Sequence, residues 1–394
     1  MVASINERAS HLGTETAFTV LARAAELTAA GRDIINLGIG QPDFPTPEHI
    51  VEAGIKALRD GHHGYTPSGG VLPLKEAVST DIHRRHGVDI SPGNIQILPG
   101  GKVIIFFSAM LMGEAGREII YPDPGFPIYQ SAIAFSGATP RPYPLLAENN
   151  FAFSADDVLG RITEKTSLII VNSPANPTGG VTPREEIEKL VRGLEDHPHV
   201  AIMSDEIYDQ LVFEGNTMTS LLEFPEIRDR LIILNGWSKT YAMTGWRLGY
   251  AVWPSFLIEA ADKLAVNIHS CVNAAAQQAA LAALTGPQDC IAEMRQAFER
   301  RAGLISRGLN ALPGITCRPP AGAFYAFPNI SLTGLSSQSL QTSLLEEAGV
   351  ALISGTSFGD LGEGYIRFSC ANSDDAIGQA LERIRTWLEG HLSA

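Results

Sequence analysis

Six short apolar runs between about Asn94 and Trp253 constrain the fold of this 394-residue chain more than any other feature. The runs are 95–98, 118–121, 168–171, 200–203, 231–234 and 248–252, and helical patterns separate most of them. Each run is almost continuously apolar, which is typical of a strand that is covered on both faces. The sequence therefore predicts an α/β fold with a mainly parallel, doubly wound sheet at its centre.

One of the connecting helices can be predicted from its own start signal. Thr182 would be the N-cap, Pro183 the first helical residue and Glu185 the acidic partner of a capping box. A helix that begins there would join the runs at 168–171 and 200–203 into a βαβ unit.

The chain is long enough for two hydrophobic cores, since 394 residues with 45% apolar content exceed one ordinary domain. Beyond about Gln277 the pattern changes to long helices followed by short strand-like segments. We therefore expect a large domain at 45–277 and a smaller α+β domain at 278–394. The segment 1–44 has no predicted sheet of its own, and we expect it to pack against the smaller domain.

Charge and cysteine content exclude several classes of function. The net charge is −14 without any block rich in lysine or arginine, so we expect neither nucleic acid nor a membrane as partner. The four cysteines are widely spaced, which indicates neither a zinc site nor a disulfide framework and fits a reducing cytoplasm. No signal peptide or membrane span is recognisable at the N-terminus or elsewhere. Small molecules are the expected ligands.

Residue types suited to ligand binding follow the carboxyl ends of five predicted strands, the edge where open α/β sheets bind their ligands. In chain order these residues are Gly101, Lys102, Phe126, Asn176, Asp205, Tyr208, Ser238 and Lys239. Because parallel strands end at one edge, we expect the five turns to face a single crevice.

Three of these turns suggest a specific chemistry. Lys239 is one of only seven lysines and lies in a turn where its amine could form an imine, although an isolated lysine is usually a surface charge. Gly101 and Lys102 begin an apolar helix whose N–H groups suit a phosphate, but such turns are often only structural. Arg247 lies among aromatic and glycine neighbours and suits a phosphate too. Asp205 would be partly buried, and its alternative role is to cap a helix.

Together these groups match the requirements of pyridoxal 5'-phosphate (PLP): an amine, a carboxylate for the ring nitrogen, donors for the phenolic oxygen and a phosphate cradle. With them in place, the chain resembles the class I/II, fold-type I aminotransferases of the aspartate aminotransferase superfamily. The resemblance runs nearly end to end, through Asn36-Leu-Gly-Ile-Gly-Gln-Pro-Asp-Phe44, Gly64-Tyr-Thr-Pro-Ser-Gly69, Asn176-Pro-Thr-Gly179, Ser238-Lys239 and Arg367.

The resemblance implies roles at the reacting centre. Lys239 would hold the cofactor covalently, and Asp205 would face the pyridinium nitrogen. Tyr208 and Asn176 would contact the phenolic oxygen. The catalytic residues would thus be Lys239, Asp205 and Tyr208.

The resemblance also implies how the rest of the cofactor is held. Gly101, Lys102 and Arg247 would bind its phosphate, with a contribution from Ser238. Phe126 stands where the family commonly has a tryptophan or tyrosine stacked on the ring, and phenylalanine can stack but cannot donate a hydrogen bond.

Two further contacts follow from the same resemblance. Gly40 and Arg367, with Asn176, would hold the α-carboxylate of the substrate. Tyr65 would reach the phosphate from a neighbouring subunit, which implies a homodimer with shared active sites.

The activity implied is transfer of the amino group of an α-amino acid to a 2-oxo acid in a two-step, ping-pong cycle. The alternative is a C–S β-lyase on the same scaffold, which would use the same residues. A transcription factor with an aminotransferase-like domain would need a basic winged-helix segment before Asn36, and that segment is not basic. The sequence does not predict the kind of side chain that the substrate carries. Nothing in it places Arg23 or Arg32 in the side-chain pocket, and Phe18, Tyr65 and His269 could line that pocket or belong to the core.

Overall fold

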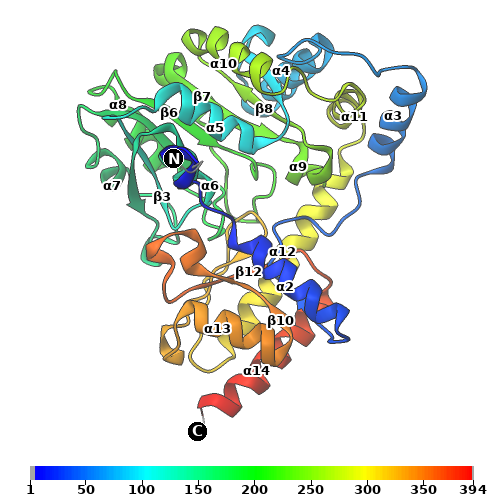
Figure 1. The fold of residues 1–394 in the computed structure, drawn as a ribbon, viewed down its shortest axis with the longest axis vertical. Coiled ribbons are helices and arrows are strands. Elements are labelled where there is room, and N and C mark those ends of the chain that lie inside the picture. Colours follow the sequence, from blue (N-terminus) through cyan, green and yellow to red (C-terminus); the bar gives the residue numbers. More distant parts are fainter. Residues whose placement is uncertain (1–4, 393–394) are drawn as a thin grey trace.

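A seven-stranded sheet forms the centre of the larger part of the molecule (Figure 1). In the computed structural model, which describes residues 5–392, the strands lie in the order β2-β8-β7-β6-β5-β3-β4. Their bounds are β2 Ile95–Leu98, β3 Glu118–Asp123, β4 Thr139–Pro144, β5 Thr166–Asn172, β6 Ala201–Asp205, β7 Leu231–Gly236 and β8 Gly249–Val252. β8 runs antiparallel to β2 and β7, while the other neighbours are parallel. The predicted, mainly parallel sheet is confirmed.

β4 is the strand of this sheet that the sequence did not reveal. It forms the edge beyond β3 and contains prolines at positions 140, 142 and 144. Proline has no N–H to donate to a ladder, so a segment with three prolines is expected at a sheet edge and not in a central strand. Most of β4 is also at least partly exposed, so no apolar run marks it.

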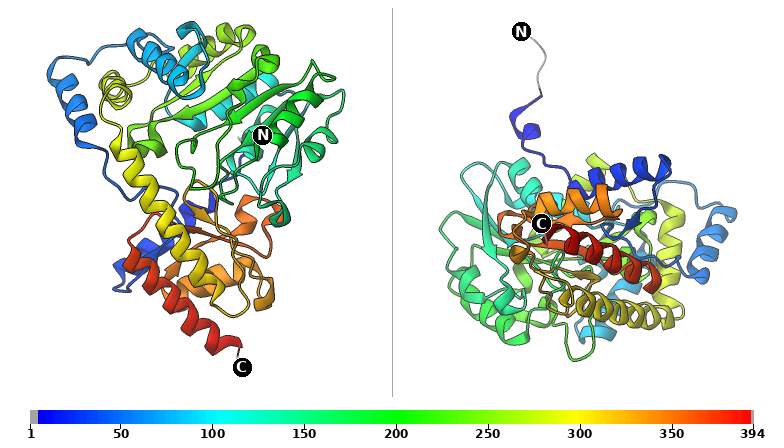
Figure 2. Two further views of the ribbon diagram at one scale, coloured as in Figure 1. Left: turned by 180° about the vertical axis from the view of Figure 1, so that it is seen from behind. Right: turned by 90° about the horizontal axis from the view of Figure 1, so that it is seen from below.

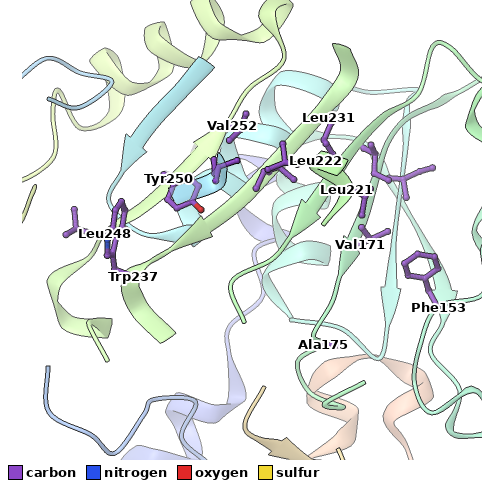
Figure 3. Packing of buried hydrophobic residues seen from close by; sticks show 14 of the residues in the cluster. Phe153, Val171, Ala175, Leu221, Leu222, Leu231, Trp237, Leu248, Tyr250 and Val252 are labelled. Carbon is purple, nitrogen blue, oxygen red and sulfur yellow. The ribbon is translucent and has the colours of Figure 1, made fainter. Parts of the chain in front are cut away.

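Helices cover both faces of the sheet, as a doubly wound fold requires. Their bounds are α3 Glu48–Arg59, α4 Leu72–His86, α5 Gly101–Met112, α6 Ile128–Ser136, α7 Ala155–Leu159, α8 Arg184–Leu194, α9 Trp237–Thr240, α10 Ser255–Ile268 and α11 Ala274–Thr285. Along β5, Leu168 and Ile170 face a core shared with α5, α6 and α10. Ile169 and Val171 face the opposite core, shared with α3, α4, α8 and α11 (Figure 3). This alternation between two cores explains why the strands read as continuously apolar.

The start of α8 differs from the predicted capping box. The helix is present, but Pro183 is its N-cap and no side chain caps it. The neighbouring Glu186 instead accepts a hydrogen bond from the backbone N–H of Ala155, at 2.6 Å. The helix prediction is therefore confirmed. The prediction of a Thr182–Glu185 box is wrong because the helix begins one residue later, at Arg184, so that Thr182 precedes the N-cap and Glu185 is only the second helical residue.

The smaller part of the molecule holds two short sheets and the C-terminal helices (Figures 1 and 2). Its sheets are β1 Ile35–Asn36 paired in parallel with β10 Val350–Ala351, and the antiparallel set β11 Ile353–Ser354, β12 Ile366–Ser369 and β9 Tyr325–Ala326. Its helices are α2 Thr16–Ala29, α12 Asp289–Asn310, α13 Ser337–Ser343, a π-helix at Leu344–Ala348 and α14 Asp374–Leu392. The first helix of the N-terminal segment, α1 Glu7–Ser10, instead contacts α6 of the larger part. The N-terminal segment therefore contributes a strand that the sequence did not predict, and α2 packs on β10 and β11.

Two features are not found in the described part of the chain. None of its helices is both long enough and apolar enough to cross a membrane. Between residues 5 and 392, no three side chains of His, Cys, Asp or Glu are grouped so that they could hold a metal ion.

Candidate active site

A cavity of about 490 Å³ lies between the two parts of the molecule. One wall is formed by residues at or after the ends of β2, β3, β5, β6 and β7. The other includes residues 36 and 38–41, residues of the small three-stranded sheet, and residues between 15 and 21 at the start of α2. The predicted site residues that line it are Gly40, Gly101, Lys102, Phe126, Asn176, Asp205, Tyr208, Ser238, Lys239, Arg247 and Arg367. The expectation that five turns face one crevice is confirmed.

The Lys239 amine points into this cavity from the short helix α9, directly after β7. Trp237 anchors the turn, because its ring is buried and its Nε1–H donates to the carbonyl of Ala280 at 3.1 Å. Lys239 Nζ donates to the carbonyl oxygen of Gly40 at 2.5 Å. Burial, with added repulsion from Arg367, lowers the pKa of Lys239 to about 7. A large fraction of the amine is therefore neutral, and nucleophilic, near pH 7.

Asp205 ends β6 with only 4% of its surface exposed. The Tyr129 hydroxyl donates to Oδ2 at 2.7 Å, and the backbone N–H of Ile207 donates to Oδ1 at 3.2 Å. Burial raises the pKa of Asp205 to about 6, although both hydrogen bonds oppose the shift. A buried, ionised carboxylate is stable only when a cation lies beside it, and a protonated ring nitrogen would be such a cation.

Tyr208 and Asn176 lie at the junction of the two walls. The Tyr208 and Tyr325 hydroxyls are 2.9 Å apart and hydrogen-bonded. Burial raises the pKa of Tyr208, so its hydroxyl stays protonated and able to donate. The Asn176 side-chain oxygen accepts from Arg367 Nη1 at 2.9 Å, and its backbone N–H donates to Asn172 at 3.0 Å.

Arg367 is a buried cation with an unused donor. It lies in β12 with 4% exposure, and Nη2 donates to the carbonyl of Gly38 at 2.6 Å. The rings of Tyr325 and Phe358 flank the guanidinium at 4.5 and 4.8 Å, while its Nε has no hydrogen-bond partner. A carboxylate would satisfy this donor through the planar fork. Gly40 keeps the space open, since a Cβ there would come within 2.6 Å of the Tyr325 hydroxyl.

The opposite end of the cavity combines a helix start with a guanidinium. α5 begins at Gly101, so its first N–H groups lack helical acceptors. Gly100 has φ +95°, and a Cβ there would lie 2.3 Å from Arg247 Nη2. Glycine at this position therefore lets Arg247 approach the helix start. The N–H groups and the guanidinium together suit a phosphate dianion.

Lys102 shares the start of α5, but its side chain is engaged elsewhere. Its ammonium forms an ion pair with Glu15 and lies 5.4 and 5.8 Å from the ring centroids of Phe18 and Phe126. The phosphate role of Lys102 stays a prediction, and only its backbone N–H is unaffected by this ion pair.

The sequence analysis did not identify several residues that line the site, among them Glu15, Tyr129, Tyr325 and Phe358. Tyr129 could have been found, because it follows Phe126 at helical spacing in the turn after β3. Nothing in the local sequence marks Glu15.

The residues whose placement was left open fall into different groups. Phe18 lines the cavity. Tyr65 does not line it and is 93% exposed, whereas His269 stacks on Phe107 at 6.0 Å. Arg23 and Arg32 face Glu346 outside the cavity.

The donor set fits PLP at each of its functional groups. A nucleophilic amine, a buried acid and neutral hydroxyl and amide donors line one cavity with a phosphate cradle. The free Nε of Arg367 leaves a separate place for a substrate carboxylate. Phe126 supplies an aromatic face beside Tyr129, with ring centroids 5.8 Å apart.

Comparisons with known proteins agree with this geometry. Residues 32–384 match the family model described as aminotransferase class I and II. The aspartate aminotransferase of Geobacillus stearothermophilus is 39% identical over 97% of this chain and 98% of its own length. The aspartate/prephenate aminotransferase of Nitrosomonas europaea is 36% identical over 98% of this chain and 99% of its own. The crystal structure of the aspartate aminotransferase from Rhizobium meliloti superposes with a TM-score of 0.94 at 33% identity, covering 98% of this chain and 99% of that one.

Proposed function

The chain belongs to the class I and II aminotransferases and is a PLP-dependent enzyme that transfers amino groups between amino acids and 2-oxo acids, and on this premise we propose how its residues divide the work. Lys239, Asp205 and Tyr208 are the catalytic residues. The observation that carries the proposal is the Lys239 amine, with a pKa of about 7, in one cavity with a buried acid and a buried arginine.

In this proposal a different set of residues binds each functional group of the cofactor. Asp205 would accept a hydrogen bond from the ring nitrogen, and Tyr208 and Asn176 would donate to the phenolic oxygen. Phe126 would supply the aromatic face for the ring. Gly101, the backbone N–H of Lys102, Ser238 and Arg247 would hold the phosphate. When bound, PLP supplies an electron sink for the charge that develops at the substrate α-carbon.

Lys239 moves the proton. Its Nζ takes the proton from the substrate α-carbon, holds it and later releases it. A pKa near 7 suits this double role, because an acid–base catalyst works best when its pKa lies close to the working pH. The Tyr208 hydroxyl stays protonated because its pKa is raised. Lys239 is therefore the group that exchanges a proton with the substrate.

Arg367 orients the substrate. Its free Nε and planar fork bind the α-carboxylate, and the hydrogen bonds to Asn176 and Gly38 fix the guanidinium in place. Gly40 leaves room beside Tyr325. Holding the α-carbon near Lys239 Nζ converts an encounter into a positioned reaction, which can supply several powers of ten in rate.

The test is a half-reaction without an acceptor. The holoenzyme mixed with one amino acid should release about one equivalent of its 2-oxo acid per site and then stop until a second 2-oxo acid is added. Continuous release of pyruvate and ammonia from a cysteine thioether, without an acceptor, would support the C–S β-lyase instead. No observation on the site or its relatives favours that alternative.

We also propose a homodimer with shared active sites. Tyr65 is 93% exposed and lies outside the cavity of its own chain, so it is free to enter another. Leu58, Phe256, Val266 and Ile268 are large apolar side chains with more than half of their surface exposed, which suits a subunit interface. A cytoplasmic location is proposed as well, supported by four cysteines that are all free thiols.

Complementation tests the shared site. A Lys239→Ala subunit paired with a Tyr65→Ala subunit should form one intact site per mixed dimer, so mixing the two variants should raise the activity above the mean of the two homodimers. A monomer in sedimentation, or no gain on mixing, would contradict the proposal.

A further inference from the structure

The cavity holds one more cation than the proposed function uses. Its positively charged lining residues, among those described, are Lys102, Lys239, Arg247 and Arg367. Under the proposed function Lys239 binds the cofactor, Arg247 its phosphate and Arg367 the α-carboxylate. The ammonium of Lys102 is the remaining cation that could meet a charged substrate side chain.

Glu15 already neutralises that ammonium. The two side chains form an ion pair in which Glu15 is 14% and Lys102 41% exposed. Glu15 is the N-cap residue of α2, yet its carboxylate caps no N–H of that helix. An acid at this position ordinarily serves the helix start. Here the Glu15 carboxylate instead pairs with Lys102 at the edge of the cavity.

Apolar side chains surround the Glu15–Lys102 pair, and the pair lies close enough to Lys239 and Arg367 to affect their charges. The rings of Phe18 and Phe126 flank the Lys102 ammonium, and Ala17, Leu21 and Ile105 line the cavity nearby in sequence. The charge of Glu15 also acts on Lys239 and Arg367, since it opposes the lowering of both pKa values. The carboxylate is therefore within electrostatic reach of the two groups that would meet the α-carbon and the α-carboxylate of a bound substrate.

We propose that Glu15 is a specificity-determining residue that excludes substrates with a side-chain carboxylate and favours those with uncharged, apolar side chains. A second carboxylate would have to displace Glu15 from Lys102 or lie beside it as a like charge, and both are unfavourable where water is partly excluded. The inference rests on the proposed function. It covers both half-reactions, because the donor leaves as a 2-oxo acid and the acceptor leaves as an amino acid through the same cavity.

Glu15→Gln removes the charge and keeps the size. The measured quantity is the ratio of kcat/KM for aspartate to kcat/KM for leucine in half-reactions of the holoenzyme. The ratio should lie below one in the wild type and rise at least about fivefold in Glu15→Gln. Glu26→Gln is the matched control, because it removes a carboxylate from the same helix at an exposed pair with Arg23 and should leave the ratio unchanged.

Two further experiments test whether the change in the ratio depends on Lys102 and whether it arises from binding. In the double variant Glu15→Gln/Lys102→Met the gain should disappear, because the released ammonium is what would bind the extra carboxylate. Dissociation constants of succinate and 3-phenylpropionate, measured by titration, should shift in favour of succinate by a similar factor in Glu15→Gln. Glu15→Ser serves as a second variant should Glu15→Gln fail to fold.

A wild-type preference for aspartate, or a smaller rise in Glu15→Gln, would overturn the inference. Absence of a half-reaction with every amino acid would refute the proposed function instead. In that event the ratio of the two inhibitor dissociation constants still decides whether Glu15 discriminates against a second carboxylate.

Discussion

The two walls of the cavity are built in different ways. On the large sheet, Asp205 is the last residue of β6 and Lys239 lies three residues beyond β7, so short local geometry fixes them. The facing wall is assembled from distant segments: Arg367 is bonded to Gly38 and Asn176, which are 329 and 191 positions away in sequence. The first wall carries groups that every substrate needs, whereas the second depends on how the smaller part is packed. The second wall holds Arg367, which every substrate needs, and is joined by Glu15 at the start of α2, which we propose to set specificity.

The largest expected effect is on the first wall. Lys239→Ala removes the nucleophile and the proton carrier together, and kcat should fall by at least about 10⁴-fold. Turnover with each amino donor measures this. Lys263→Ala, at an exposed pair with Glu259, is the control and should retain wild-type activity. A Lys239→Ala enzyme with appreciable turnover would place the reacting amine elsewhere.

A smaller loss is expected on the second wall. Arg367→Lys keeps the charge but loses the planar fork, so kcat/KM should fall by roughly 100-fold for every α-amino acid. A uniform loss across donors would separate this residue from Glu15, whose replacement should change the ratio between donors. Arg383→Lys, at a surface pair with Asp33, is the control. Equal activity of Arg367→Lys would mean that the α-carboxylate binds elsewhere.

The buried acid predicts a pH effect on the protein without cofactor. The pKa of Asp205 is about 6 in the folded protein, above its value of about 3.9 in an unfolded chain. Its neutral form is thus favoured by folding, and that contribution is complete below about pH 4 and lost as the pH rises through about 6. Relative to Asp205→Asn, the wild-type apoprotein should lose at most about 3 kcal/mol of stability over this range.

Thermal denaturation midpoints of both apoproteins between about pH 4.5 and 7.5 test this difference. Glu206 is also buried, with a pKa raised to about 7, but it is present in both proteins and cancels. Midpoints that change in parallel with pH would show that Asp205 does not carry a raised pKa.

The smallest effect concerns how Asp205 is held within the first wall. Tyr129→Phe removes the hydroxyl that donates to Oδ2, which should weaken PLP binding about fivefold. Tyr143→Phe is a matched control, since it removes a buried hydroxyl that donates to the Ile170 carbonyl outside the cavity. Cofactor titration of both apoproteins gives the comparison. Equal affinities would indicate that Asp205 needs no support from Tyr129.

The sequence predicts the first wall better than the second for a physical reason. Strand ends bring their residues to one edge regardless of the rest of the chain, so Lys239, Asp205 and Asn176 could be grouped from apolar runs alone. The pair of Glu15 and Lys102 joins positions 87 apart through the docking of α2, and no local pattern encodes it. The edge strand β4 was hidden by its prolines.

Some expectations stay predictions. The domain bounds at residues 44 and 277 are untested, and position 277 falls inside α11, which packs on α3 and α4.

Reduction of the holoenzyme with borohydride, followed by peptide mass mapping, tests the central claim most directly. Reduction makes the link between cofactor and amine permanent, so the account predicts one phosphopyridoxyl group per chain on the peptide that contains Lys239. The same group on the peptide that contains Lys102, or on no lysine at all, would contradict it.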